Sequence, residues 1–260
     1  MSVTDASASA KRWRFREPSA LGGFWPSFSF VVLYLSIIVL IPLAALALRP
    51  WELGLEGVWR VVSSERTVAA LKLSFGAAAI AASVNAVFGT IVAWALVRYE
   101  FPGKRVIDAL VDLPFALPTA VAGIALASIY VVFIGFPFVV RAVQPVLADL
   151  DRDVEEAAAT LGASRWRTIS QVIWPAIAPA ILTGFALAFA RAVGEYGSVI
   201  FIAGNIPMVS EIAPLLIVIK LEEFDYAGAA AIGLAMLCVS FVMLFLLNGA
   251  HALMTRRGAA

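Results

Sequence analysis

The chain has 260 residues, of which 62% are hydrophobic and 14% are charged, and its formal net charge is +1. Ordinary soluble domains are about 25% charged, so too few charges remain here to cover a water-soluble globule. A mean hydropathy of +0.94 indicates that lipid forms part of the solvent. The single histidine and the single cysteine, Cys238, cannot supply a metal site, and no disulfide or cofactor is expected.

Helices that cross a membrane need about 20 predominantly apolar residues. The chain contains five uncharged stretches of about this length, which predict an all-α, polytopic membrane protein. They are Phe28–Leu48, Leu73–Val97, Leu113–Val140, Thr168–Ala190 and Tyr226–Thr255. The polar and basic residues that precede the first stretch show no cleavable signal, so we expect them to be retained.

Lysine and arginine outside the apolar stretches predict the orientation, because cytoplasmic loops are enriched in both. Basic clusters precede the first stretch, follow the second, precede the fourth and follow the last. We therefore expect residues 1–27 and 252–260 to be cytoplasmic and residues 28–251 to form the membrane domain. Both termini would face the cytoplasm of a bacterial inner membrane.

This orientation requires two crossings between Arg105 and Arg152, since both residues should be cytoplasmic. Only residues 106–147 are available for these crossings, which leaves almost no outer loop. The sequence therefore predicts about six transmembrane helices, with spans three and four abnormally short.

The longest hydrophilic stretch on the predicted inner side is residues 149–175. Val154, Ala157, Ala158 and Leu161 recur at helical spacing and predict an amphipathic helix, capped by Asp151 or Asp153. Gly162 is a natural left-handed stop. A second helix can start at Ser164 and bury the apolar side chains that follow: Trp166, Ile169, Val172 and Ile173. An interfacial hairpin with no partner would have the same local structure.

The spacing within this loop is more specific than its helical pattern. Glu156-Ala157-Ala158 is followed after three residues by Gly162, and after nine more by Val172-Ile173-Trp174-Pro175. This arrangement resembles the cytoplasmic coupling motif of ABC importer permeases. The resemblance implies that Glu156, Ala157, Ala158, Gly162 and Pro175 belong to a loop that docks on an ATPase subunit. It also implies the ABC type I importer permease fold.

Other segments, among them Phe185–Gly228 and Leu113–Ala125, are similar to the T-type permease subunit of sulfate/thiosulfate importers. The resemblance covers most of the chain from about Leu71 to the last span. Members of that family carry an outer loop and the start of the fourth span between the equivalents of Tyr130 and Val131. These two residues are directly joined here, at the place where the span count is short.

The resemblance also implies partners. They are two cytoplasmic ATPase subunits, a second related permease subunit and a periplasmic sulfate-binding protein, together with membrane lipid and no nucleic acid. The chain itself has no G-x-x-x-x-G-K-[ST] phosphate loop, so we expect a transport subunit that is not an enzyme.

Arg191 and Glu195 lie four residues apart and therefore on one face of a helix in the predicted fifth span. Charges in a span usually face protein or water, so the pair could line the translocation path or could fix helix packing. Asn85 in the second span is expected to form a hydrogen bond between helices.

Three rival functions remain open. A molybdate/tungstate importer permease would share the coupling motif. An ion-coupled secondary transporter would show inverted repeats, and none is seen. An intramembrane enzyme would need a convergent nucleophile, base or metal set within the spans, and the sequence offers none.

Overall fold

The computed structural model describes residues 23–117 and 130–258. Every regular element within these two ranges is helical. The chain divides into two units, Met1–Ala45 and Leu46–Ala260. The predicted all-α fold is therefore confirmed for the described residues.

The first unit contains α1 (Phe24–Leu35), a π-helical turn η1 (Ser36–Leu40) and most of α2 (Ile41–Leu48). No side chain of these three elements is buried. Their residues are apolar around the whole helix circumference, which is typical of a helix solvated by lipid. Helix α1 begins at Phe24, slightly before the predicted start of the membrane domain at residue 28.

Three helices of the second unit form its tightly packed core: α4 (Glu65–Arg98), α8 (Tyr130–Asp149) and α11 (Trp174–Val193). Glycine allows this close packing. A Cβ atom at Gly89 of α4 would lie 2.8 Å from the Cβ of Val139, and one at Gly184 of α11 would lie 2.7 Å from the Val139 Cα. A side chain at either glycine would therefore collide with α8, so the two glycines permit the close approach that is common in membrane helix contacts.

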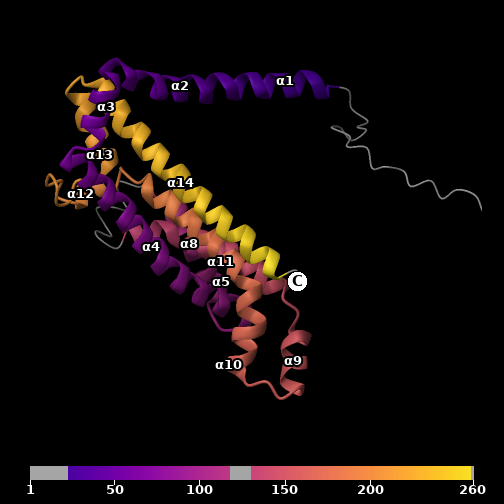
Figure 1. The fold of residues 1–260 in the computed structure, drawn as a ribbon. Coiled ribbons are helices and arrows are strands. Elements are labelled where there is room, and N and C mark those ends of the chain that lie inside the picture. Colours follow the sequence, from indigo (N-terminus) through magenta and orange to yellow (C-terminus); the bar gives the residue numbers. More distant parts are fainter. Residues whose placement is uncertain (1–22, 118–129, 259–260) are drawn as a thin grey trace, which may run out of the picture. The chain divides into compact units, whose positions relative to one another are not determined.

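The remaining helices of the second unit lie around this core and at its two ends (Figure 1). Helix α14 (Tyr226–Gly258) packs along α11 and includes most of the predicted C-terminal tail. The helices at one end are α9 (Arg152–Thr160) and α10 (Arg165–Thr168), and those at the other are α3 (Gly54–Val62), α12 (Val199–Ile202) and α13 (Ala213–Glu222). The 3-10 turn η2 (Arg49–Leu53) and the π-helical turn η4 (Ile169–Ile173) join neighbouring helices.

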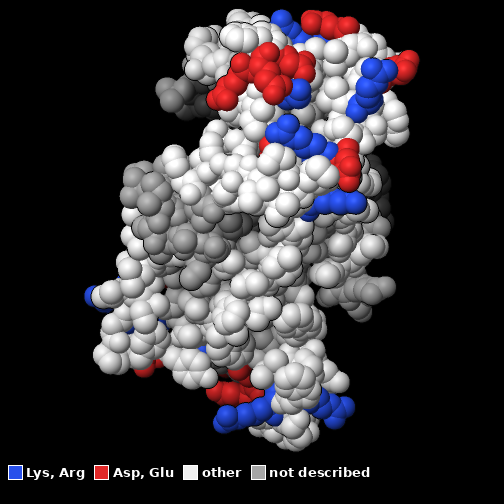
Figure 2. Space-filling view, turned by 90° about the vertical axis from the view of Figure 1, so that its left-hand side faces the viewer, with Lys and Arg blue, Asp and Glu red and all other residues white. Residues whose placement is uncertain are grey.

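Charge is distributed along the second unit as expected for a membrane protein. On the face shown in Figure 2, charged side chains gather near the end with α12 and α13 and near the end with α9 and α10. Mostly uncharged surface separates the two groups. Lipid can cover such a band, because it exposes few groups that require water.

The described residues include five helices long and apolar enough to cross a membrane. They are Phe24–Val62, Glu65–Arg98, Val132–Asp149, Arg165–Val193 and Tyr226–Met254. The prediction of six crossings stays a prediction, because most of the third crossing falls on residues 118–129, outside the described residues.

The third apolar stretch is divided between two helices in the described residues. Leu113–Val140 is not one helix: α6 (Leu113–Ala116) is short, and α8 continues past Arg141 to Asp149. The charge of Arg141 does not end the span, because Asp108 and Asp112 pair with it from α5 (Lys104–Val111) and the residue after it. Sequence alone gave no sign of these partners.

Candidate coupling hairpin

The predicted helix, glycine turn and second helix are all present at the lower end in Figure 1. Helix α9 is capped at Asp151, whose Oδ1 accepts a hydrogen bond from the Asp153 amide at 3.1 Å. Gly162 has a φ of 81°, and the Ala163 amide donates to the Ala158 carbonyl at 3.0 Å, which closes the helix. Ser164 then caps α10 by accepting from the Arg167 amide at 3.4 Å. Residues 149–175, here termed the coupling hairpin, thus have the predicted local structure.

The apolar side chains of the coupling hairpin are less buried than predicted. The exposed fractions are 88% for Leu161, 76% for Trp166 and 46% for Val154. Ile169 is also exposed, and only Ile173 is buried among the side chains predicted to lie in a core. The hairpin extends beyond the end of the helical bundle, so no element of the described chain covers its tip. Exposed apolar patches of this kind mark interaction surfaces.

The motif residues lie on and beside this tip. Glu156 and Ala157 are exposed and Ala158 is half-buried in α9, while Gly162 forms the turn. Pro175 lies in the first turn of α11, directly after the π-helical turn η4, and π-helical turns and prolines often occur together at such irregular points of a helix. The structure therefore brings four of the five residues to the hairpin and places the fifth where the hairpin enters the bundle.

The Arg191–Glu195 pair is present, but its surroundings differ from the prediction. Helix α11 ends at Val193, so Glu195 lies in the turn after the helix and not within it. Its Oε2 accepts from Arg191 at 2.6 Å, and its Oε1 accepts from the Ser198 amide at 3.2 Å and from the Ser198 hydroxyl at 2.8 Å. Both oxygens of this buried carboxylate are thus used to hold a turn. This geometry favours the packing role, while one third of the Arg191 side chain stays exposed.

A second buried pair was missed in the sequence. Arg66 of α4 donates two 2.7 Å hydrogen bonds to Glu211, whose side chain is 1% exposed. Near it, the Ala213 amide donates to the buried Ser74 hydroxyl at 2.8 Å. These contacts fix the start of α13 on α4. A glutamate just before an apolar run in a membrane protein indicates that the charge has a partner. The sequence does not show which residue this is, because Arg66 lies 145 positions away from Glu211.

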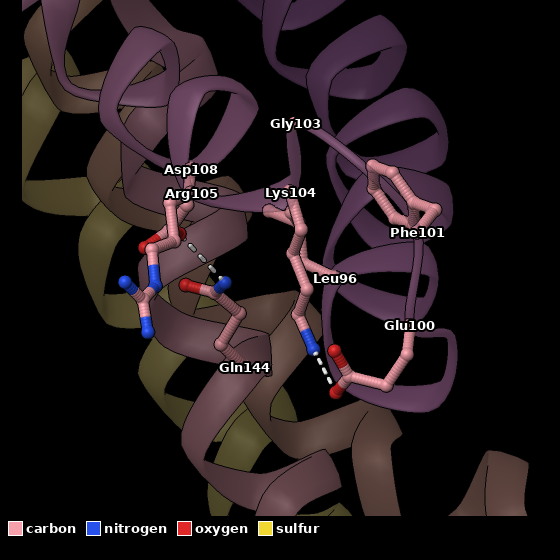
Figure 3. Close-up of a pocket in the computed structure, with 8 residues that line it drawn as sticks. All are labelled: Leu96, Glu100, Phe101, Gly103, Lys104, Arg105, Asp108 and Gln144. Atoms are coloured by element: carbon pink, nitrogen blue, oxygen red, sulfur yellow. Dashed lines mark hydrogen bonds and ion pairs between the residues drawn. The ribbon is translucent and has the colours of Figure 1, made fainter.

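A polar cavity of about 510 Å³ lies near the hairpin end of the bundle (Figure 3). Two cations and two carboxylates line it, namely Lys104, Arg105, Glu100 and Asp108. Lys104 donates to Glu100 at 2.7 Å, and Gln144 donates to Asp108 at 3.1 Å. The hydrogen bond from Gln144 is the main cause that lowers the pKa of Asp108 below its usual value, and the hydrogen bond from Arg141 lowers it further. With balanced charges, this cavity shows no preference for an anion.

Among the described residues, none forms the predicted hydrogen bond between helices with the side chain of Asn85. The side chain is 1% exposed, and neither its Nδ2 nor its Oδ1 has a hydrogen-bond partner among the described residues. It lies against Gly135 of α8. In the same described residues, no group of three or more His, Cys, Asp or Glu side chains could hold a metal ion.

The apolar helices are those of a multi-pass membrane protein, and the hairpin projects from one end of them. A family model described as the binding-protein-dependent transport system inner membrane component matches residues 85–258. The sulfate transport system permease protein CysT of Synechocystis sp. is 44% identical, covering 86% of this chain and 90% of that protein. Its Escherichia coli K12 counterpart is 42% identical, covering 91% and 95%. The chain belongs to this family of inner-membrane transport components.

Solved structures support the same fold. A bacterial ABC transporter that imports the acidic polysaccharide alginate matches with a TM-score of 0.73 at 14% identity, covering 88% of this chain and 94% of that one. The same kind of transporter, solved with an alginate-bound periplasmic protein, matches with a TM-score of 0.75. The predicted ABC importer permease fold is therefore confirmed.

The alignment length also shows a difference between this chain and a relative. The alignment with the Synechocystis protein runs over 256 positions, whereas it includes only 86% of the 260 residues of this chain. The aligned length thus exceeds the residues that this chain contributes. The relative therefore contains residues without a counterpart in this chain.

Proposed function

We propose that this chain is the membrane-spanning permease subunit of an ATP-driven importer for sulfate or thiosulfate. The observation that carries the proposal is the coupling hairpin, which presents the exposed side chains of Val154, Leu161 and Trp166 beyond the helical bundle. Relatives that are 42–44% identical and carry the name of sulfate permeases support the substrate. Molybdate or tungstate is the alternative substrate.

The coupling hairpin would dock on a cytoplasmic ATPase subunit. The apolar tip supplies buried contact area, and the exposed Glu156 can pair with a cation of the ATPase. The turn at Gly162 keeps the two short helices in a fixed arrangement, so the hairpin can transmit a displacement. ATP hydrolysis would reside in two such ATPase subunits, since this chain has no phosphate-binding loop.

The other partners follow from the family. A second related permease would complete the membrane core, and a periplasmic sulfate-binding protein would deliver the anion. Both termini and the coupling hairpin would then be cytoplasmic, in agreement with the basic residues that flank the spans. The end with α12 and α13 would face the periplasm.

Proteoliposomes that contain the complete transporter test the proposal. ATP-dependent accumulation of radiolabelled sulfate is expected, and excess thiosulfate should compete with it more strongly than molybdate. Stronger competition by molybdate would show that molybdate is the preferred substrate. Uptake without any ATPase subunit would contradict an ATP-driven importer.

Labelling in cells tests the orientation of the hairpin. Leu161→Cys should react with a membrane-impermeant maleimide only after the inner face of the membrane is exposed. Labelling from outside would exclude docking on a cytoplasmic ATPase.

Glu156→Lys tests the docking itself. Reversing this exposed charge should leave membrane insertion unchanged and lower both ATPase binding and sulfate uptake. Thr160→Lys in the last turn of the same helix is the control, because it adds a cation without removing the carboxylate. Equal uptake in the Glu156 variant and the native chain would show that Glu156 is not part of the docking surface.

A further inference from the structure

The coupling hairpin is joined to the membrane-spanning helices by an ion pair that lies outside the docking motif. The Nη2 of Arg98, the last residue of α4, donates a hydrogen bond to Oε1 of Glu155 in the first turn of α9. These residues lie 57 positions apart. Among the side chains that the structure describes, this is the one ion pair between the hairpin and a spanning helix.

The arginine side of this pair is held firmly. The Arg98 side chain is only 10% exposed, and its guanidinium carbon lies 5.6 Å from the centre of the Trp94 ring, one turn earlier on α4. A cation over an indole face is attracted to it. Breaking the ion pair would leave a nearly buried charge without its partner, which is strongly unfavourable. Arg98 therefore has one preferred position, and the position of Arg98 determines that of Glu155.

The Nε of Arg98 is buried and has no hydrogen-bond partner among the described residues. Arginine can bind a carboxylate through two parallel N–H groups. Because Nε is unused in this way, the guanidinium can also bind the second oxygen of Glu155 when α9 tilts. The pair can thus remain closed through a change in the angle of the hairpin.

Packing around the pair is open. A groove of about 450 Å³ separates the hairpin from the end of α4, and it is lined by Trp94, Tyr99, Glu155, Ala159 and Ala163, with further residues of α10 and η4. Beside the ion pair, this groove therefore separates α9 from α4, while Ile173 of η4 packs in the same core as Ala93 and Leu96 of α4. The charged contact is the rigid connection across the groove.

We propose that the Arg98–Glu155 pair transmits the displacement of the coupling hairpin to α4. Both residues are positioning residues: they touch neither the transported anion nor ATP, and they lie beside the docking motif, not within it. This inference rests on the proposed function and adds to it the contact that links docking to movement of a spanning helix.

Glu155→Gln and Arg98→Gln test the pair in the complete reconstituted transporter. ATP hydrolysis should continue, while the number of sulfate ions taken up per ATP should fall about tenfold, as for typical coupling between two sites. The charge swap Arg98→Glu with Glu155→Arg should restore much of this ratio. A purely structural role would lower hydrolysis and uptake together and would contradict the inference.

The pair formed by Lys104 and Glu100 is the matched control (Figure 3). It joins the segment after α4 to α5 at 2.7 Å, and Glu100 is 88% exposed. Lys104→Gln should leave the ratio of sulfate to ATP unchanged. An equal loss in this variant would show that the effect is general to the charges at this end.

Two outcomes separate this inference from the proposed function. If the native transporter takes up no sulfate with its partners, the proposed function is wrong. If it does, and both single variants keep the native ratio, only the inference fails. Should Glu155→Gln prevent assembly, Glu155→Asp decides, because it keeps the charge and shortens its reach. A native ratio in this variant would also contradict the inference.

Discussion

The two ends of the second unit are built differently. The end with α12 and α13 is fixed by Glu195 and Glu211, two buried carboxylates whose oxygens are fully used by neighbouring groups. The coupling hairpin instead ends in exposed apolar side chains. It continues through η4 into α11, and its one described ion pair with another spanning helix lies beside an open groove. One end is suited to remain rigid, and the other is suited to move with a partner.

The largest effect is expected at the rigid end. Arg66→Ala would leave the carboxylate of Glu211 buried and unpaired, which should destabilise the fold by about 2–3 kcal/mol. This loss is smaller than for a fully buried ion pair, because the side chain of Arg66 is 39% exposed. Thermal unfolding in detergent would measure this loss. Arg60→Ala breaks a fully exposed pair with Glu56 and should change little. Similar unfolding temperatures for both variants would mean that this end is not fixed by its buried charge.

At the hairpin end, Gly162→Val should affect coupling more than stability. The φ of 81° at this residue costs a β-branched side chain about 1–2 kcal/mol, which is enough to distort the turn but not the spans. We expect normal insertion and ATP hydrolysis that is no longer linked to sulfate uptake. Gly76→Val, at a helical glycine with open space around its Cα, is the control. Unchanged uptake in the Gly162 variant would show that the turn is not needed for transmission.

Lengthening the chain before the fourth span should have a smaller effect on sulfate uptake. Within the described residues, α8 covers the 20 residues Tyr130–Asp149, which at about 1.5 Å per residue just match the ~30 Å thickness of the hydrocarbon core and leave no residue for an outer loop. Insertion of a relative's outer segment after Tyr130 should therefore raise sulfate uptake. Equal rates with and without the insertion would show that the short form is sufficient, and that length is not what distinguishes this region.

The smallest effect concerns the pH dependence of the contact between α5 and α8. The pKa of Asp108 lies below its ordinary value, so the carboxylate stabilises the fold fully above the pKa of the unfolded chain. This contribution is lost only as the pH falls through the lower, folded pKa. The difference in unfolding temperature between the native chain and Asp108→Asn should thus be constant from about pH 5 to pH 8. A decrease within this range would contradict the assigned hydrogen bonds.

Local features of the coupling hairpin could be predicted because they depend on neighbours in the sequence. The cap at Asp151, the left-handed Gly162 and the start of α10 after Ser164 each follow from residues within one helical turn. Exposure could not be predicted in this way. The amphipathic pattern suggested that Trp166 would be buried, yet a pattern defines an apolar face without saying what covers it.

The sequence by itself therefore determined the membrane environment, most of the spans, the hairpin and the family resemblance, since these depend on composition, periodicity and spacing. Only the tertiary structure decided which charges meet. Arg66 pairs with Glu211, Arg98 pairs with Glu155, and Arg141 pairs with Asp108 and Asp112, all of which are distant in the sequence. The physical reason is that a charge removed from water must find a partner, while helix packing alone determines which distant residue comes within reach.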